Sequence, residues 1–312
     1  MTDSSASPVG RAGGYRGRLA PSPTGYFHLG HLSTFDEARR RAEAAGGELV
    51  LRCDDLDVVR CKPEFVAAMY EDLRWLGFSW AEGPDVGGVS GPYEQSRRSE
   101  GYRKAWEALR DGGWIYPCRC SRKDILSNLA APHEGEEEPL YPGTCRPSGS
   151  VPLFPAEETG GGAVVWRFRV PEGERVTFLD GNLGEQSFEA GRDFGDFVVW
   201  RRDSLPSYHL AAVVDDAAMG ITEVVRGADL LLSTARQILL IRALSLPMPA
   251  YFHCSLIRDE KGRRLAKRHA SLSLRVLREQ GMTPEEVRGL LETVRERSSS
   301  VTWTRPPGLG AS

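Results

Sequence analysis

Two histidines are the residues of this chain whose spacing most plainly indicates chemistry. His28 and His31 end the segment Arg18 to His31, which reads RLAPSPTGYFHLGH. A strand-like stretch, Tyr15 to Ala20, leads into this segment, and a helical pattern ending at Gly46-Gly47 follows it. Nucleotide-binding α/β folds hold phosphates at such a strand-to-helix junction, at the N-terminus of the first helix. The pattern therefore predicts that a nucleotide reacts beside the two imidazoles.

The more usual phosphate-binding motifs are missing from the sequence. It contains no Gly-Lys dipeptide, and so no Walker A loop, and no complete G-x-G-x-x-G. An isolated His-x-x-His pair is usually structural. The Pro-Ser-Pro-Thr-Gly loop directly upstream makes that interpretation less attractive for this pair.

Three of the six cysteines lie near one another in the sequence. They are Cys118, Cys120 and Cys145. Three thiols brought together by one loop suit a structural, tetrahedral zinc ion that needs a fourth ligand. His133, in the polar stretch between them, is the fourth ligand favoured by zinc chemistry, because imidazole is a commoner donor than phenolate. The alternative is three reduced cysteines in an irregular segment.

Length and composition limit the class of protein. The 312 residues can form one large or two small domains, and the net charge of −3 gives no overall footprint for nucleic acid. Basic residues cluster from Arg258 to Arg268. From charge alone, a solvated loop explains this cluster as well as a nucleic-acid contact does. No stretch approaches the length of a membrane span and no secretory signal is present, so we expect a soluble, cytoplasmic protein without a membrane partner, and a monomer.

The elements that must position these residues follow from hydrophobic periodicity and from Pro and Gly boundaries. We expect helices at Leu32 to Ala45, Pro63 to Leu76 and Ser99 to Leu109, and strands at Glu48 to Arg52, Val164 to Val170, Val176 to Leu179 and Phe197 to Trp200.

A family resemblance is carried by the opening segment. His28-Leu29-Gly30-His31 resembles the HIGH motif of class I aminoacyl-tRNA synthetases, and Arg18 to Gly25 resembles the glutamyl and glutaminyl branch. Within that branch, the chain from about Arg16 to about Leu290 is most similar to the glutamyl-Q tRNA(Asp) synthetases. These paralogues keep the glutamate-activating body and lack the anticodon-binding domains.

The resemblance implies an α/β fold. A Rossmann-like nucleotide-binding domain would be split by a zinc-containing, acceptor-arm-like insertion and followed by a short helical stem-contact domain, with no anticodon-binding domain. The expected divisions are a disordered tail over residues 1–14, catalytic halves over 15–110 and 196–250, the insertion over 111–195, a KMSKS-like loop with the stem-contact helices over 251–293, and a disordered tail over 294–312.

The resemblance also implies roles for particular residues. The catalytic and ATP-binding residues would be His28, Gly30, His31 and Lys267, the last within the KMSKS-like run Arg264 to Arg268. The glutamate-binding residues would be Arg18, Leu19, Ala20, Pro21, Ser22, Asp54, Tyr208 and Arg226. Asp54 replaces the family's glutamate and is one methylene shorter, which leaves direct contact open. The family's C-x-C…Y-x-x-x-C pattern places Tyr141, rather than His133, as the fourth zinc ligand.

The implied reaction has two steps. L-glutamate and ATP, with Mg²⁺, would form glutamyl-adenylate, and glutamate would pass to queuosine at the anticodon wobble position of tRNA(Asp). One alternative is a truncated glutamyl- or glutaminyl-tRNA synthetase that charges a tRNA 3′ end. The other is a non-catalytic tRNA-binding paralogue, which the degenerate Arg264 to Arg268 run favours and the intact HLGH motif disfavours.

Overall fold

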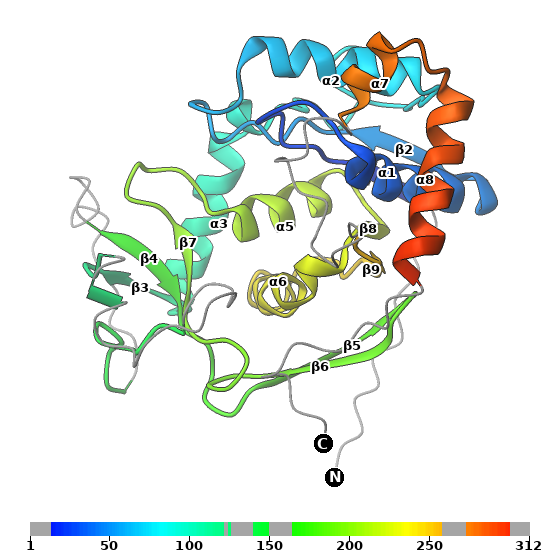
Figure 1. The fold of residues 1–312 in the computed structure, drawn as a ribbon. Helices are drawn as coiled ribbons and strands as arrows, with labels where there is room; N and C mark the ends of the chain where they lie inside the picture. Colours follow the sequence, from blue (N-terminus) through cyan, green and yellow to red (C-terminus); the bar gives the residue numbers. More distant parts are fainter. Residues whose placement is uncertain (1–13, 122–123, 126–139, 150–163, 258–272, 300–312) are drawn as a thin grey trace.

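The molecule is built around parallel strands whose carboxyl ends face one edge. The computed structural model describes residues 14–121, 124–125, 140–149, 164–257 and 273–299 (Figure 1). Strands β1 (Arg16–Leu19) and β2 (Glu48–Leu51) pair in parallel, as do β8 (Glu223–Gly227) and β9 (Ala250–Cys254). The Thr222 N–H donates to the Arg16 carbonyl at 2.8 Å, which places β8 beside β1. This arrangement confirms the expected α/β nucleotide-binding architecture.

Helices connect the parallel strands and cover them. Helix α1 (Leu29–Ala44) crosses from β1 to β2, and α2 (Pro63–Trp75) and α3 (Ser99–Asp111) follow it, as the periodicity predicts. Helix α5 (Tyr208–Ala218) precedes β8, and α6 (Leu231–Ala243) links β8 to β9. One cluster of buried apolar side chains joins α1, β1 and β2, and a second surrounds α5 and α6.

The other strands pair across the segment boundaries that we expect from the sequence. Strands β3 (Ile115–Cys118), β4 (Val165–Phe168) and β7 (Phe197–Trp200) form one antiparallel sheet, so the boundary expected at 195/196 runs through a sheet. The hairpin of β5 (Arg175–Asp180) and β6 (Gly184–Glu189), expected in the insertion, instead extends the β8–β9 sheet along the lower edge of Figure 1. Which strands share a sheet is therefore set by pairing between strands distant in sequence and not by the order of the segments along the chain.

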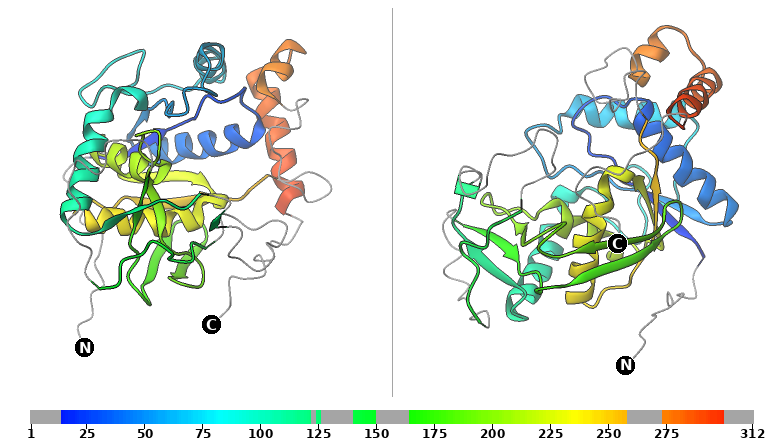
Figure 2. Two further views of the ribbon diagram at one scale, coloured as in Figure 1. Left: turned by 90° about the vertical axis from the view of Figure 1, so that its left-hand side faces the viewer. Right: turned by 60° about the horizontal axis from the view of Figure 1, so that its bottom comes forward.

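The C-terminal part consists of α7 (Leu274–Glu279) and α8 (Pro284–Ser299), with short 3₁₀ turns at Gln95–Arg97 and Ala228–Leu230 elsewhere in the chain. Helix α8 lies against α1, where Arg295 Nη2 donates to the Ser33 carbonyl at 2.9 Å (Figure 2). The helix continues to Ser299, so a disordered tail beginning at residue 294 is a prediction that the structure corrects. Helix formation to Ser299 follows from docking on α1, which the sequence pattern does not reveal. Among the described residues, no helix combines the length and apolarity needed to cross a membrane.

Candidate functional site

The N-terminus of α1 carries both histidines. His28 is the N-cap residue, and its Nδ1 accepts a hydrogen bond from the Gly30 N–H at 3.1 Å. His31 Nδ1 accepts from the His28 N–H at 3.2 Å, so the two side chains form a reciprocal capping box. Their ring centroids are 4.0 Å apart. The helix thus begins earlier than Leu32, because the histidines themselves cap it.

This capping fixes where each ring carries its proton. A nitrogen that accepts a backbone N–H bears a lone pair, so the neutral rings of His28 and His31 are protonated on Nε2. An Nε2–H donates hydrogen bonds, and the N-terminal end of a helix favours negative charge. Two imidazole donors at one helix N-terminus can therefore bind phosphate oxygens.

The residues that flank the segment containing Lys267 lie at the end of the β8–β9 pair and beside His28. The segment follows Ile257, shortly after β9 ends at Cys254, and Cys254 is paired with Gly227 at the end of β8. At its other end, the Leu274 N–H donates to the Phe27 carbonyl at 2.8 Å, directly beside His28. Lys267 itself lies outside the described residues, so its ATP contact stays a prediction.

Two buried arginines and a tyrosine gather at the ends of β1 and β8. Arg18 donates from Nη1 to the Val225 carbonyl at 2.7 Å, and its Nε has no hydrogen-bond acceptor among the described residues. Burial, more than any other influence, lowers the pKa of Arg18, and the neighbouring charges of Arg52 and Arg226 act in the same direction. Tyr208, at the start of α5, accepts from Arg226 Nη1 at 3.3 Å. The predicted residues Arg18, Tyr208 and Arg226 are therefore neighbours.

Within the described part of the chain, Arg226 is held by neutral groups. Its Nε donates to His253 Nε2 at 3.2 Å and its Nη2 to Thr234 Oγ1 at 2.6 Å, besides the bond to Tyr208. Arg226 is 4% exposed, and these described partners include no carboxylate. A buried guanidinium without a carboxylate partner is costly. This arrangement can accept the carboxylate of a ligand.

The Asp54 carboxylate is paired with another arginine, Arg52. Arg52, 1% exposed, donates from Nε to Asp54 Oδ1 at 2.7 Å and from Nη1 to Asp216 Oδ1 at 2.6 Å. Burial raises the pKa of Asp54 to about 6 in spite of this partner. Asp54 also donates its N–H to the Pro21 carbonyl at 2.9 Å, which keeps it beside the opening loop. Its contact with an amino acid ligand stays a prediction.

The remaining residues of the opening loop contribute mainly through the backbone. The Leu19 side chain is buried in the core, and its carbonyl accepts from the Arg52 N–H at 2.8 Å. Ala20 is partly exposed and Ser22 is exposed, whereas Pro21 is buried. Ala20 and Ser22 are thus the loop positions that a ligand reaches most easily.

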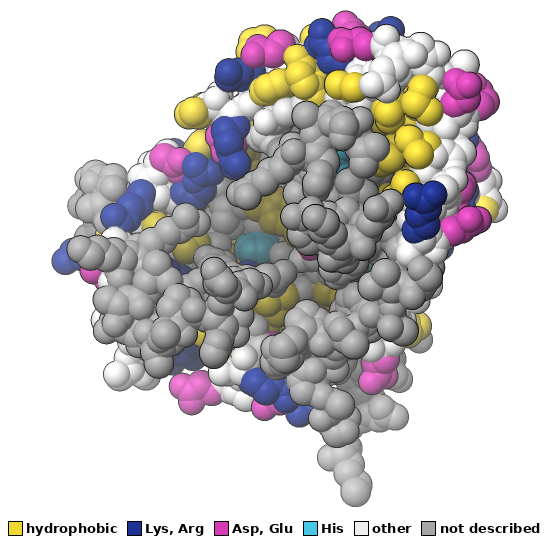
Figure 3. Space-filling view, in the orientation of Figure 1, with side chains coloured by type: hydrophobic (Ala, Val, Ile, Leu, Met, Phe, Trp, Pro, Cys, Tyr) yellow, Lys and Arg dark blue, Asp and Glu magenta, His cyan; other side chains and the backbone are white. Residues whose placement is uncertain are grey.

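Two residues beneath Arg226 escape sequence reasoning. They are Asp180, at the end of β5, and His253, in β9, which are 73 positions apart and joined by a 2.6 Å contact between Asp180 Oδ2 and His253 Nδ1. A single histidine in an apolar strand and an aspartate before a Gly turn carry no local signal. Figure 3 shows a hollow at the centre of this face with a histidine and apolar side chains visible within it, whereas His253 itself is fully buried.

The three cysteines converge as the sequence predicts. The Sγ atoms of Cys118, Cys120 and Cys145 lie within 4.8 Å of one another. The Tyr141 hydroxyl is 3.3 Å from the Cys118 Sγ and 3.5 Å from the Cys120 Sγ. Zinc bonded to thiolates at about 2.3 Å in a tetrahedron would separate its ligands by roughly 3.5 to 4 Å, so this donor set fits the ion.

A cation supports the cysteine cluster. Arg167 donates from Nε to the Cys118 Sγ at 3.3 Å, and its guanidinium lies 3.9 Å from the centre of the Tyr141 ring. Both contacts place a positive charge beside two of the candidate metal ligands. His133 lies outside the described residues.

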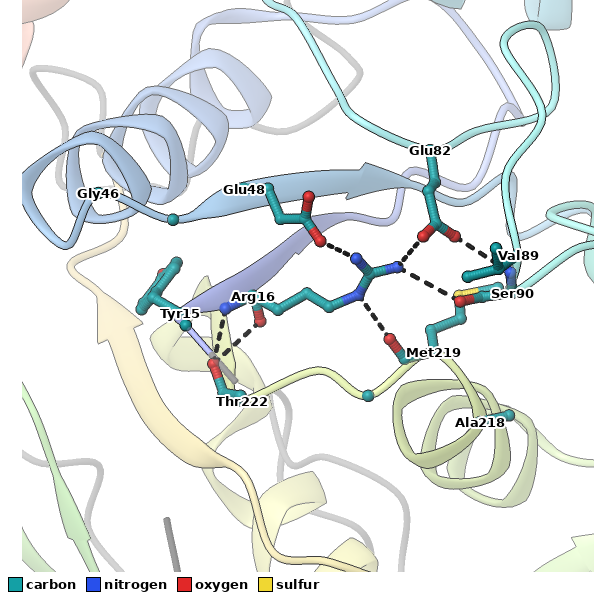
Figure 4. Close-up of a pocket in the computed structure, with 13 residues that line it drawn as sticks. Tyr15, Arg16, Gly46, Glu48, Glu82, Val89, Ser90, Ala218, Met219 and Thr222 are labelled. Carbon is teal, nitrogen blue, oxygen red and sulfur yellow. Dashed lines mark hydrogen bonds and ion pairs between the residues drawn. The ribbon is translucent and has the colours of Figure 1, made fainter. Parts of the chain in front are cut away.

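A second hollow, of about 630 Å³, opens at the opposite edge of the strands (Figure 4). Arg16 occupies it and is fully engaged by Glu48, Glu82, Ser90 and the Met219 carbonyl. Burial alone would raise the pKa of Glu82, but hydrogen bonds from Tyr93, Arg16 and Ser90 lower it to about 2. This self-contained set of ion pairs ties β1, β2 and α5 together and has no cation left for a ligand.

Comparison with known proteins agrees with the geometry. Residues 15–300 match the tRNA synthetases class I (E and Q), catalytic domain. The chain is 46% identical to the Glutamyl-Q tRNA(Asp) synthetase of Nitratidesulfovibrio vulgaris, over 88% of this chain and 85% of that protein. It is 48% identical to the protein of the same name from Symbiobacterium thermophilum, over 88% of this chain and 84% of that protein.

Among solved structures, the glutamate-tRNA synthetase of Elizabethkingia anophelis superposes with a TM-score of 0.70 at 30% identity. The match covers 82% of this chain and 53% of the Elizabethkingia chain, so this chain spans about half the length of that synthetase.

Proposed function

Since this chain belongs to the class I tRNA synthetases for glutamate and glutamine, and is a ligase of that family, we propose that it activates L-glutamate with ATP and transfers the glutamyl group to queuosine in tRNA(Asp). The proposal of glutamate activation is supported by Arg226, a buried guanidinium whose described partners are all neutral. The proposal of transfer to queuosine in tRNA(Asp) is supported by the names of the relatives that are 46% and 48% identical.

Glutamate has two carboxylates, and each needs a cationic donor in a buried site. Arg226 and Arg18 supply them: the described partners of Arg226 are all neutral, and Arg18, which is ion-paired with Asp216 at 3.7 Å, has an Nε without a hydrogen-bond acceptor among the described residues. Tyr208 adds a hydroxyl beside Arg226. Glutamine presents a neutral amide to the same arginine, which would leave the guanidinium charge uncompensated.

Activation joins the two substrates. An oxygen of the glutamate α-carboxylate attacks the α-phosphate of ATP, the bond to the β-phosphate breaks, and pyrophosphate leaves. His28 and His31 donate from Nε2 to the oxygens of the reacting phosphate, where negative charge develops. Lys267, whose segment is flanked by residues at the end of the β8–β9 pair and beside His28, neutralises the departing pyrophosphate. Mg²⁺ enters with ATP rather than through a dedicated protein site.

Transfer completes the reaction. A hydroxyl of the cyclopentenediol ring of queuosine attacks the acyl carbon of glutamyl-adenylate, and AMP leaves. Cys118, Cys120, Tyr141 and Cys145 would hold one zinc ion, with no open position for water, so that the metal stabilises the loop between β3 and β4. A truncated synthetase that charges a tRNA 3′ end remains the competing function, and the solved glutamate-tRNA synthetase at 30% identity is its support.

The activation step is tested by exchange of radiolabelled pyrophosphate into ATP. The wild-type protein should support exchange with L-glutamate, and much less with L-glutamine or L-aspartate. The assay is run with and without bulk tRNA, because some ligases require tRNA for activation. Exchange that fails with glutamate under both conditions would refute the proposed function.

A further inference from the structure

A buried chain of hydrogen bonds runs beneath Arg226. Asp180 is 2% exposed and His253 is fully buried. His253 Nδ1 lies 2.6 Å from Asp180 Oδ2, and His253 Nε2 lies 3.2 Å from Arg226 Nε. The three side chains come from β5, β9 and β8, neighbouring strands of one sheet. Their order in space is carboxylate, imidazole, guanidinium.

Hydrogen-bond donors around the Asp180 carboxylate keep it ionised. Its Oδ1 accepts from the N–H groups of Asn182 at 3.0 Å and Leu183 at 2.9 Å. The His253 N–H adds a contact at 3.1 Å to Oδ2. Burial tends to raise the pKa of Asp180, but the bonds from His253, Leu183 and Asn182 hold it below its usual value. A carboxylate with this many donors keeps its charge in a buried site.

An ionised Asp180 determines the tautomer of His253. Burial lowers the pKa of His253, which keeps the ring neutral at neutral pH. The single ring proton then sits on Nδ1, donated to Asp180, and Nε2 presents a lone pair. Only in this tautomer can Nε2 accept the Nε–H of Arg226.

Packing fixes the ring and the guanidinium in place. The Tyr251 ring stacks with His253 at a centroid distance of 6.2 Å, and the Arg226 guanidinium lies 5.5 Å from the Tyr251 ring centre. Thr234, fully buried on α6, accepts from Arg226 Nη2, and its single hydroxyl proton faces both the Leu230 carbonyl at 3.1 Å and the lone pair of His253 Nε2 at 3.0 Å. Three sides of Arg226 are thus tied to neutral acceptors, and none of the described ties neutralises its charge.

We propose that Asp180 and His253 are positioning residues for glutamate recognition, acting through Arg226. Asp180 selects the His253 tautomer, and His253 aims the guanidinium while leaving its charge for the carboxylate of the substrate. A carboxylate bonded directly to Arg226 would orient it equally well and would compete with the substrate. An intervening neutral imidazole avoids that competition. This inference rests on the proposed glutamate activation.

Two substitutions at His253 separate the two bonds of the ring. His253→Asn retains a donor near the Nδ1 position for Asp180 and removes the acceptor for Arg226. His253→Gln places an amide near the Nε2 position, where it can accept from Arg226, and removes the donor to Asp180. In the exchange assay, His253→Asn should raise the KM for glutamate by roughly 10- to 100-fold, the range for a lost hydrogen bond to a charged group. His253→Gln should raise it less, and the KM for ATP should stay within about twofold in both.

Asp180→Asn provides the second test. An amide can donate to Nδ1 and favour the opposite tautomer, which would direct an N–H toward Arg226. We expect the KM for glutamate to rise at least as much as in His253→Asn. Glu185→Gln, at an exposed carboxylate of the same hairpin, is the matched control and should behave as the wild type. Equal effects of Asn and Gln at position 253, or parallel changes in the KM for ATP, would indicate a merely structural role.

Nitrogen-15 NMR of the imidazoles gives a readout that does not depend on activity. The His253 signals, assigned by their absence in His253→Gln, should show a protonated Nδ1 and an unprotonated Nε2. The opposite tautomer in the folded wild-type protein would overturn the inference. Wild-type protein without glutamate-dependent exchange, but with the expected tautomer, would count against the proposed function and leave the positioning of Arg226 in place.

Discussion

His28 and His31 cap the first turn of α1 for each other, through Nδ1 contacts of 3.1 Å to the Gly30 N–H and 3.2 Å to the His28 N–H. Each ring therefore uses Nδ1 to accept a backbone N–H, which leaves the proton of the neutral ring on Nε2. The capping role of the two histidines and their proposed phosphate-binding role thus involve different atoms. Substitutions can separate them.

His28→Asn and His31→Gln should keep the cap and lose the phosphate donor. Asn is a good N-cap residue and Gln suits the third position of a capping box. We expect thermal stability to fall by less than about 1 kcal/mol, and glutamate-dependent exchange to fall roughly 10²- to 10³-fold, the cost of a lost transition-state donor. His28→Ala, which loses both functions, is the comparison. Retained exchange in both amide variants would show that the imidazoles act only as caps.

Arg18→Gln and Arg226→Gln should each weaken glutamate binding. Both arginines are buried, and truncating one partner of a buried charge pair costs about 2 to 5 kcal/mol. The KM for glutamate should rise by roughly 100-fold or more, with the KM for ATP little changed. Steady-state exchange at varied glutamate and ATP measures both constants. Arg103→Gln, an exposed arginine on α3, is the control. An unaltered KM for glutamate in Arg226→Gln would remove this arginine from the site.

The cysteine cluster should hold one zinc ion per chain. Cys118→Ser should lose the metal and lower the melting temperature, because metal affinity is coupled to folding of the loop. Tyr141→Phe should weaken zinc retention during dialysis against a chelator, whereas His133→Ala should not. Metal content measured by atomic absorption decides between the two candidate ligands. Zinc lost from His133→Ala and kept by Tyr141→Phe would reverse the assignment, and zinc-free wild-type protein would dismiss the site.

Glu82 should stabilise the fold in a pH-dependent way. Its pKa of about 2 in the folded protein lies below the ordinary value of 4.5, so its contribution is complete above pH 4.5 and is lost as the pH falls toward 2. Glu82→Gln should cost about 1 to 3 kcal/mol at pH 7, since it breaks bonds to Arg16 and Tyr93. Urea unfolding from pH 7 to pH 3.5 should show the difference from wild type narrowing only below pH 4.5. A difference independent of pH would refute the ion pair.

The elements near the N-terminus are predictable because their signals are local. The strand-like stretch before Pro21, the helical periodicity after His31 and the Gly46-Gly47 stop lie within one stretch of sequence, and β1, α1 and β2 form there. The convergence of Cys118, Cys120 and Cys145 is equally predictable, because the three cysteines lie near one another in the sequence.

Long-range pairing is what sequence reasoning misses. Nothing within Arg175–Asp180 shows that this strand joins β9, and nothing near Phe197–Trp200 shows that it pairs with β4. Strands on the two sides of the expected boundary at 195/196 therefore pair with each other. Asp180 and His253 are missed for the same reason, since their partnership exists only after β5 and β9 are neighbours.

The position of the glutamyl group on the tRNA distinguishes queuosine from the 3′ end as its acceptor. Bulk tRNA containing queuosine is incubated with the protein, ATP and labelled glutamate, then cleaved with a nuclease that separates the anticodon fragment from the 3′ end. We predict label on the anticodon fragment of tRNA(Asp), and none on tRNA prepared without queuosine. Label on the 3′ terminal fragment would contradict the account and identify the chain as a synthetase that charges the tRNA end.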